Sequence, residues 1–156
     1  PYLPYAYRHP EYGRKIKEEA KRGKDMIASL DIFRDSEAAH PIREEEYIKV
    51  EQIKGKLLLI GAKDDVLWDT VKYIRRMEKR LSQRPHDCET EIAVYEHGTH
   101  FVFPEGVMKT MLPVGLGLFM RLMFKAAKQN AKACRQTRED IDRRVTADLA
   151  AWRDEK

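Results

Sequence analysis

The sequence predicts an α/β fold in which a few parallel strands are flanked by helices. Residues 56–62 form a short, continuous apolar run, residues 91–95 form a second strand-like run, and the apolar positions between them recur at helical spacing. A strand, a helix and a strand in this order form a crossover unit whose two strands are parallel. The chain has 156 residues, 42% of them hydrophobic and 36% charged, which is enough for one domain with a real core.

The region ahead of the first strand is predicted to be mostly helical. Residues 1–10 are rich in Pro and Tyr and indicate an irregular, extended segment. A helix is expected from Glu11 to about Leu30, where Lys, Glu and Ala dominate, and a second, short one over 35–40, ahead of a proline. Residues 44–53 fit either a helix or an extended lead-in. We therefore divide the chain into a helical segment over residues 1–47 and a second part over 48–156 that holds the two predicted strands.

The crossover unit is predicted in most detail. The strand over 56–62 is apolar nearly throughout, which is typical of a strand buried on both faces. A polar turn follows, and a helix is expected to begin near Trp68 or Asp69. A second strand over 91–95 leads to a turn at 96–100. The apolar stripe of the helix comprises Leu67, Val71, Ile74, Met77 and Leu81.

Two more helices are expected in the last third of the chain. Residues 114–136 should be helical after a turn rich in Pro and Gly, and a final helix should run from about Thr137 to Trp152. The most apolar stretch, 111–124, is shorter than the roughly 20 residues that a membrane-spanning helix needs, and it contains Arg121. It is therefore expected to be a core or interface helix.

Composition argues against several function classes. The 30 basic and 26 acidic residues are interleaved and leave a net charge of +4, whereas nucleic-acid-binding proteins cluster basic residues on one face. Two cysteines make neither a disulfide framework nor a metal site. We therefore expect a cytoplasmic protein with no nucleic-acid partner, no membrane partner, no metal and no cofactor.

Polar side chains follow both predicted strands at the point where each strand ends. Asp64 and Asp65 come after the first strand, and His97 and His100 after the second. Functional groups gather at the carboxyl ends of parallel strands, which share one edge of the sheet. A carboxylate there can orient an imidazole and stabilise its protonated form, which is the acid–His half of a nucleophilic triad. The order acid then His also matches the order in α/β-hydrolases.

Each of these residues also has a structural interpretation. An Asp between a strand and a helix is often only a helix N-cap, although Asp69-Thr70 offers an alternative cap. A His in a turn that contains Gly is more often a structural or exposed loop residue than a base. Both interpretations stay open for Asp65 and His100 on spacing alone.

The central region resembles a known family. Its residues read Val-Glu-Gln-Ile-Lys-Gly-Lys-Leu-Leu-Leu-Ile over 50–60, Asp-Asp-Val-Leu-Trp over 64–68 and Tyr-x-x-Gly-x-His over 95–100. This pattern is similar to the C-terminal region of the acyl-CoA thioesterase and bile-acid-CoA:amino-acid N-acyltransferase family, which is similar to dienelactone hydrolases. The resemblance implies the C-terminal part of an α/β-hydrolase fold, with Asp65 as triad acid and His100 as base. The strongly apolar stretch over 111–124 departs from the family pattern.

The sequence contains no Gly-x-Ser-x-Gly or Gly-x-Cys-x-Gly nucleophile motif. It also begins with Pro1 rather than Met, without a signal-peptide pattern. We therefore expect a C-terminal fragment of an acyl-CoA thioester hydrolase or acyltransferase, which supplies acid and base and is inactive alone. Acyl-CoA or a related thioester would be the substrate of the intact enzyme, and the fragment would self-associate through exposed sheet edges.

A second hypothesis comes from a different class of protein. The chain could be a non-catalytic α/β interaction module whose basic helices face an acidic partner. The candidate contacts are Arg75-Arg76, Lys79-Arg80 and Arg143-Arg144. Interleaved acidic residues favour the simpler interpretation of these charges as solvated helix faces.

Overall fold

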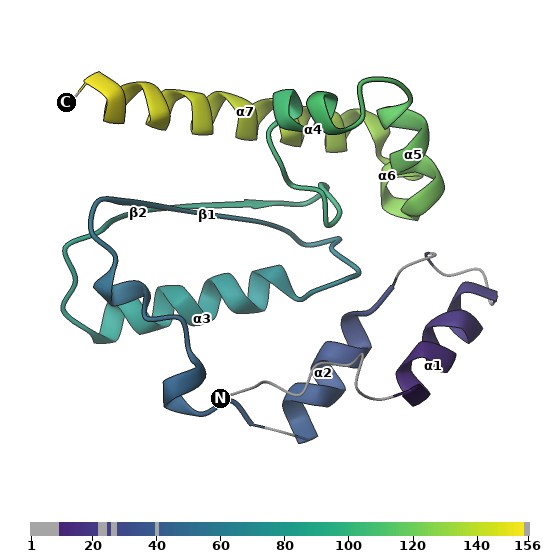
Figure 1. The fold of residues 1–156 in the computed structure, drawn as a ribbon, viewed down its shortest axis with the longest axis horizontal. Helices are drawn as coiled ribbons and strands as arrows, with labels where there is room; N and C mark the ends of the chain where they lie inside the picture. Colours follow the sequence, from purple (N-terminus) through teal and green to yellow (C-terminus); the bar gives the residue numbers. More distant parts are fainter. Residues whose placement is uncertain (1–9, 22–24, 26–27, 40, 155–156) are drawn as a thin grey trace.

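The computed structural model describes residues 10–21, 25, 28–39 and 41–154 (Figure 1). Its described part contains a parallel pair of strands, β1 (Lys56–Ala62) and β2 (Glu89–Tyr95), in register from Lys56 opposite Glu89 to Ala62 opposite Tyr95. The helix α3 (Thr70–Gln83) connects the two strands. The predicted α/β class and the parallel pairing are therefore confirmed, and β2 begins two residues earlier than predicted.

Helices lie on both sides of the strands. Figure 1 shows α3 on one side and the long helix α7 (Ala131–Asp154) on the other. A Cβ atom on Gly61 of β1 would lie 2.7 Å from Cδ1 of Ile74 and 3.2 Å from Cβ of Thr70, so a larger residue there would require side chains of α3 to shift. Asp69 caps α3 by accepting a hydrogen bond from the backbone N–H of Lys72 at 3.2 Å. The helix thus begins where the sequence predicts.

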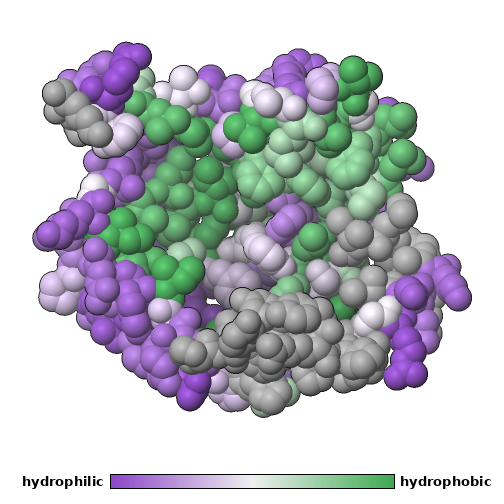
Figure 2. Space-filling model, in the orientation of Figure 1, coloured by the Kyte–Doolittle hydropathy of each residue, from purple (hydrophilic) through white to green (hydrophobic). Residues whose placement is uncertain are grey.

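Burial of β1 on both faces is only partly correct. Leu59 is buried, whereas Leu58 and Ile60 on the other face are half-buried, and on that face only Ala62 at the end of the strand is buried. The side chains of Leu58 and Ile60 line an open hollow of about 510 Å³ beneath α7. Figure 2 shows apolar side chains exposed at the level of the strands, between the helical layers. These side chains stay partly exposed because α7 is the one described helix on this face, and it does not cover the whole of it.

The N-terminal helices differ from the prediction in their bounds. The first, α1 (Pro10–Lys21), ends nine residues before the predicted end at Leu30, and α2 (Leu30–Ala39) begins five residues before its predicted start. The cause is a tertiary contact: the backbone N–H groups of Ser29 and Leu30 both donate to the carbonyl oxygen of Val66, at 2.9 and 3.0 Å. The predicted extended segment lies outside the described residues except for Pro10, and His40 also lies outside them.

The ambiguous stretch over 44–53 forms two short 3-10 turns. They are η2 (Glu44–Glu46) and η3 (Val50–Gln52), and Val50 is almost fully buried. Its side chain belongs to a small core cluster with Leu81 and Cys88. This cluster joins the lead-in to the end of α3, at the far end of the strands from the polar turns.

The predicted helix over 114–136 is divided between α5 (Leu116–Met123), α6 (Lys125–Gln129) and the start of α7, which runs without a break through the predicted boundary at Thr137. A further helix, α4 (Glu105–Met111), precedes this stretch. The break between α5 and α6 falls at Phe124, which has extended backbone angles and a side chain that is 1% exposed. Turning the chain there places the phenyl ring in the core, and this packing overrides helix propensity.

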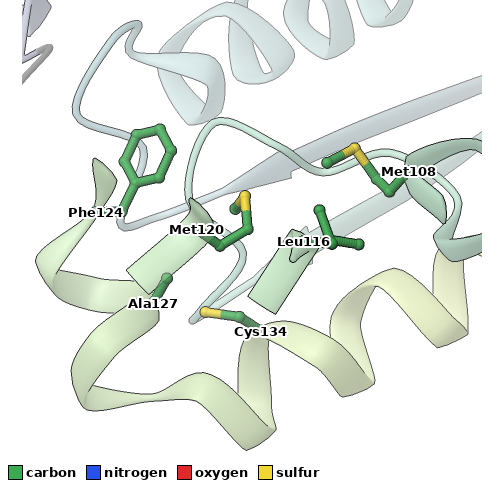
Figure 3. Close-up of a cluster of buried hydrophobic side chains, with 6 residues drawn as sticks. All are labelled: Met108, Leu116, Met120, Phe124, Ala127 and Cys134. Atoms are coloured by element: carbon green, nitrogen blue, oxygen red, sulfur yellow. The ribbon is translucent and has the colours of Figure 1, made fainter. Parts of the chain in front are cut away.

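The apolar stretch over 111–124 is divided between core and surface. Figure 3 shows its buried side, which forms a cluster from α4, α5, α6 and α7. Val66, Leu67 and Phe101 from the two polar turns pack against this cluster. The buried members are Met108, Leu116, Met120, Phe124, Ala127 and Cys134, and the exposed apolar side chains of α4, α5 and the turn between them are Val107, Met111, Val114, Leu118 and Leu122.

Within the residues that the structure describes, no single helix is long and apolar enough to cross a membrane. The pair α4 and α5 passes this test of length and composition only when both are counted together, and they meet at a bend of 94°.

A buried ion pair fixes α4 to α7, since Nε of Arg138 donates to Oε2 of Glu105 at 2.7 Å.

Candidate active site

The two polar turns meet at one edge of the strands. Ala62 and Tyr95 are opposite each other in the register and end β1 and β2. The backbone N–H of Lys63 continues the pairing by donating to the carbonyl oxygen of Tyr95 at 2.9 Å. The turns that follow therefore run side by side, and they bring Asp64 and Asp65 to His97 and His100 as the sequence predicts.

Asp65 and His100 form a buried pair. Oδ2 of Asp65 lies 3.1 Å from Nδ1 of His100, and the side chains are 1% and 20% exposed. The other carboxylate oxygen, Oδ1, accepts the backbone N–H groups of Leu67 at 2.8 Å and Trp68 at 3.1 Å. Asp65 is thus not the N-cap of α3. One of its oxygens fixes its own turn, and the other orients the imidazole.

The contact leaves the second nitrogen of His100 available for chemistry. Within the described part of the chain, Nε2 has no hydrogen-bond partner. A carboxylate at Nδ1 favours the tautomer that carries its proton there, so that Nε2 can accept one. The ring is held on its sides by aromatic neighbours: the centroid of Trp68 lies 4.8 Å away and that of Phe101 5.9 Å away, both edge-on.

Asp64 and His97 form a second, more open pair. Oδ2 of Asp64 lies 3.3 Å from Nδ1 of His97, whose side chain is 40% exposed. Oδ1 of Asp64 accepts the backbone N–H groups of Gly98 at 2.9 Å and Thr99 at 2.7 Å. This carboxylate therefore ties the first turn to the backbone of the second, just ahead of His100.

The backbone of the second turn is strained where it leads into His100. Thr99 is fully buried and has a φ of 61°, which is unusual for a β-branched residue. Its hydroxyl accepts the backbone N–H of Phe101 at 3.3 Å. A Cβ atom on Gly98 would lie 2.7 Å from Val102 and 3.0 Å from Ala62, so the turn packs too tightly for any larger residue. Sequence reasoning missed these holding roles of Asp64 and Thr99, although the Asp-Asp doublet was visible.

Tyr95 anchors the start of the second turn to α7. Its hydroxyl donates to Oδ2 of Asp140 at 2.6 Å, and Nε of Arg144 donates to the same oxygen at 2.8 Å. Burial, together with the Asp140 carboxylate, raises the pKa of Tyr95 to about 12. The hydrogen bonds from Arg144 and Tyr95 lower the pKa of Asp140. Thr137 adds a hydrogen bond from its hydroxyl to the carbonyl oxygen of His97 at 2.5 Å.

Ser29, Ser82 and Cys88 have hydrogen-bond partners other than His100, and the thiol of Cys134 is buried in α7. Ser29 donates to the carbonyl oxygen of Leu67, and Ser82 to that of Lys79. Cys88 lies just before β2, at the opposite end of the strands, within 3.4 Å of His86. Cys134 is 1% exposed in α7, and burial raises the pKa of its thiol to about 11, which disfavours the nucleophilic thiolate.

The basic pairs of the alternative hypothesis are largely matched by acidic groups of the chain itself. Arg76 pairs with Glu37, and Arg80 pairs with Glu44 and Glu51. On α7, Arg143 and Arg144 both pair with Asp140. Among the described residues, no group of three or more side chains is placed to hold a metal ion.

Comparison with known families gives one result. Residues 7–105 match the family described as BAAT / acyl-CoA thioester hydrolase C terminal. The chain belongs to this family. The match covers more than half of the chain, includes both polar turns and ends at the first residue of α4. No curated protein and no solved structure matches the chain. The suspected family is thus confirmed, and membership of this family is consistent with the α/β fold.

Proposed function

We propose that this chain supplies the acid and the base of a catalytic triad that cleaves acyl-CoA thioesters. The observation that supports this most is the contact between Oδ2 of Asp65 and Nδ1 of His100 at the carboxyl ends of parallel strands. In this role Asp65 orients the imidazole and stabilises its protonated form, and His100 is the general base.

The proton transfers follow from this arrangement. Nε2 of His100 takes the proton of a nucleophilic hydroxyl or thiol as that group attacks the thioester carbonyl carbon. When the carbon–sulfur bond breaks, the imidazolium returns the proton to the departing CoA thiolate. His100 then takes a proton from water or from an amine acceptor as that group attacks the carbonyl carbon of the acyl-enzyme, and it returns this proton to the enzyme's hydroxyl or thiol when the acyl product leaves. Water gives a hydrolase, and an amine gives an acyltransferase.

The nucleophile belongs to polypeptide outside these 156 residues. The sequence holds no nucleophile-elbow motif, and the described Ser29, Ser82, Cys88 and Cys134 hydrogen-bond elsewhere or lie at other places in the fold. The proposal therefore includes that the 156-residue chain alone does not turn over acyl-CoA.

The test compares this chain with a version extended upstream along its own reading frame. Release of free CoA from a medium-chain acyl-CoA is measured with a thiol reagent. We expect no turnover by the 156-residue chain and clear turnover by the extended one. His100→Ala in the extended chain should lower kcat/KM by about 10³-fold or more, whereas the matched control His97→Ala should change it by less than about tenfold.

Two results would contradict the proposal. Turnover by the 156-residue chain that disappears in His100→Ala would place the nucleophile inside this chain. Turnover by the extended chain that His100→Ala leaves unchanged would remove His100 as the base.

A further inference from the structure

An apolar pocket lies beside the candidate active site. It has a volume of about 360 Å³ and lies between α2, η2 and α3. Its walls include Phe33, Ile42, Tyr47, Ile48, Trp68 and Met77. We propose that this pocket receives the apolar acyl group of the thioester. The identity of the ligand rests on the proposed function, whereas the existence of an apolar binding site does not.

Trp68 connects the pocket to the reacting groups. Its indole lies edge-on to His100, with ring centroids 4.8 Å apart, and edge-on to Phe33, with centroids 6.0 Å apart. The side chain is 46% exposed, so one surface of the ring is open to a ligand. A thioester whose carbonyl lies at His100 can thus extend its acyl group along the indole and into the pocket.

The cations in the pocket wall are already neutralised. Arg76 pairs with Glu37, and its guanidinium lies 5.5 Å from the ring centroid of Tyr47 and 5.3 Å from that of Tyr73. Arg80 pairs with Glu51 at 2.5 Å and with Glu44 at 2.9 Å. Because acidic partners take up these charges, the pocket offers little to an anionic ligand. An uncharged hydrocarbon group fits it better.

The same contacts link the side chains of the pocket wall to one another. The Arg76 guanidinium attracts both tyrosine rings by cation–π interaction, which favours a preformed pocket. The volume of the pocket lies within the range of small-molecule binding sites, which are mostly apolar and largely preformed. A preformed pocket avoids the cost of ordering its walls on binding.

Three other hollows lined by described residues fit an acyl group less well. The one beside His97 and the one along the outer face of α3 have polar, charged walls. The one beneath α7 is mostly apolar, but it is lined by Lys56, Leu58 and Ile60 of β1 and by α7, and no residue of either polar turn contributes to it. Among these hollows, only the pocket at Trp68 is both apolar and in contact with the site.

The experiment uses the 156-residue chain and the fluorescence of Trp68. The chain has two tryptophans, so Trp152→Phe makes Trp68 the only source of indole emission. The probe is 11-bromoundecanoic acid, because bromine quenches indole fluorescence on contact. We expect saturable quenching, reversed by undecanoic acid and not by free CoA.

A matched pair of variants locates the binding site. Ile48 in the pocket wall and Leu118 on α5 are similarly exposed, at 72% and 64%, so Asp is tolerated by the fold at either position. In the Trp152→Phe background, Ile48→Asp should weaken binding of the probe about tenfold, because it places a charge at the apolar wall. Leu118→Asp should leave binding unchanged.

Absence of saturable quenching, or equal weakening by both variants, would overturn the pocket assignment. Competition by free CoA would assign the pocket to the CoA part instead, which would also overturn it. Because binding needs no nucleophile, these outcomes are separate from the activity test. A chain that binds the probe but whose extended form lacks turnover would retain the pocket and lose the proposed reaction.

Discussion

Two neighbouring Asp–His pairs occupy the same edge of the strands, yet they differ in burial and in what each carboxylate holds. Asp65 is 1% exposed and faces a His that is 20% exposed, whereas Asp64 is 17% exposed and faces a His that is 40% exposed. Oδ1 of Asp65 binds amides of its own turn, and Oδ1 of Asp64 binds amides of the opposite turn. One carboxylate therefore orients a ring, and the other joins two loops.

This difference shows how adjacent residues of one type can have separate tasks. A carboxylate that is fixed by its own turn has its second oxygen free to hold an imidazole in one orientation. A carboxylate that accepts two backbone N–H groups of another loop through one oxygen contributes mainly to the conformation of that loop. We therefore expect Asn at position 65, which keeps an acceptor for its own turn, to act mainly on the reaction, and loss of the carboxylate at position 64 to act mainly on stability.

The largest expected effect is on the reaction. In the upstream-extended chain, Asp65→Asn should lower kcat/KM by about 10³- to 10⁴-fold, because an amide cannot stabilise the imidazolium and can favour the wrong tautomer. Asp64→Asn should lower it less than about tenfold. The measurement is CoA release, with the thermal midpoint of both variants as a control for folding. Equal losses of activity in the two variants would erase the distinction between the pairs.

The next largest effect is on stability, and it comes from the Asp64 carboxylate. Asp64→Ala leaves the backbone N–H groups of Gly98 and Thr99 without their acceptor, which should cost about 2–4 kcal/mol in the free energy of unfolding. Asp64→Asn keeps an acceptor oxygen and should recover most of this loss. His97→Ala, at an exposed ring, should cost less than about 1 kcal/mol. Urea unfolding of the 156-residue chain measures all three, and a negligible cost for Asp64→Ala would contradict the holding role.

The position of the four polar residues at this edge of the strands could be predicted from the sequence. The separate roles of the two carboxylates could not. The apolar run ending at Ala62 and the strand ending at Tyr95 predict a parallel pair, and a parallel pair brings the residues after them together. Nothing in the letters Asp-Asp says which carboxylate faces an imidazole and which faces backbone amides. That depends on the direction of each side chain in a turn whose geometry includes Thr99 in a left-handed conformation.

The misplaced helices have a similar cause. Local composition predicts an uninterrupted helix across Phe124. The chain turns there instead, because the ring of Phe124 is buried among Met120, Ala127 and Cys134. Likewise, α2 begins at Leu30 because backbone groups next to it bond to Val66, far away in the sequence. Both boundaries are set by contacts that a local window does not contain.

A smaller effect should come from the tight packing beneath the second turn. Gly98→Ala brings a methyl group to 2.7 Å from Val102 and 3.0 Å from Ala62, so the turn that carries His100 must shift, at a cost of about 1–3 kcal/mol. The matched control is Gly117→Ala in α5, where nothing lies within 4 Å and alanine should be neutral or stabilising. Thermal unfolding compares them. If Gly98→Ala were as stable as the control, the turn would be adaptable, and the rigid placement of His100 would lose its support.

The smallest expected effect is a change in stability with pH that comes from Tyr95. This residue lies just ahead of the turn that carries His97 and His100, so its contact with α7 supports both Asp–His pairs. Its pKa is raised to about 12 in the folded chain, against an ordinary value of about 10, so the unfolded chain loses the proton first as the pH rises. The stability from this hydroxyl is complete below about pH 10 and is lost as the pH rises towards about 12. Because the ring is partly solvated, we expect a loss of only about 1 kcal/mol. Urea unfolding at pH 8 and pH 11.5 should show this extra loss in the native sequence and not in Tyr95→Phe. An identical loss in the two proteins would mean that the bond from Tyr95 to Asp140 does not hold the turn. The difference between the Asp64–His97 and Asp65–His100 pairs would then arise from the two polar turns themselves, without a contribution from α7.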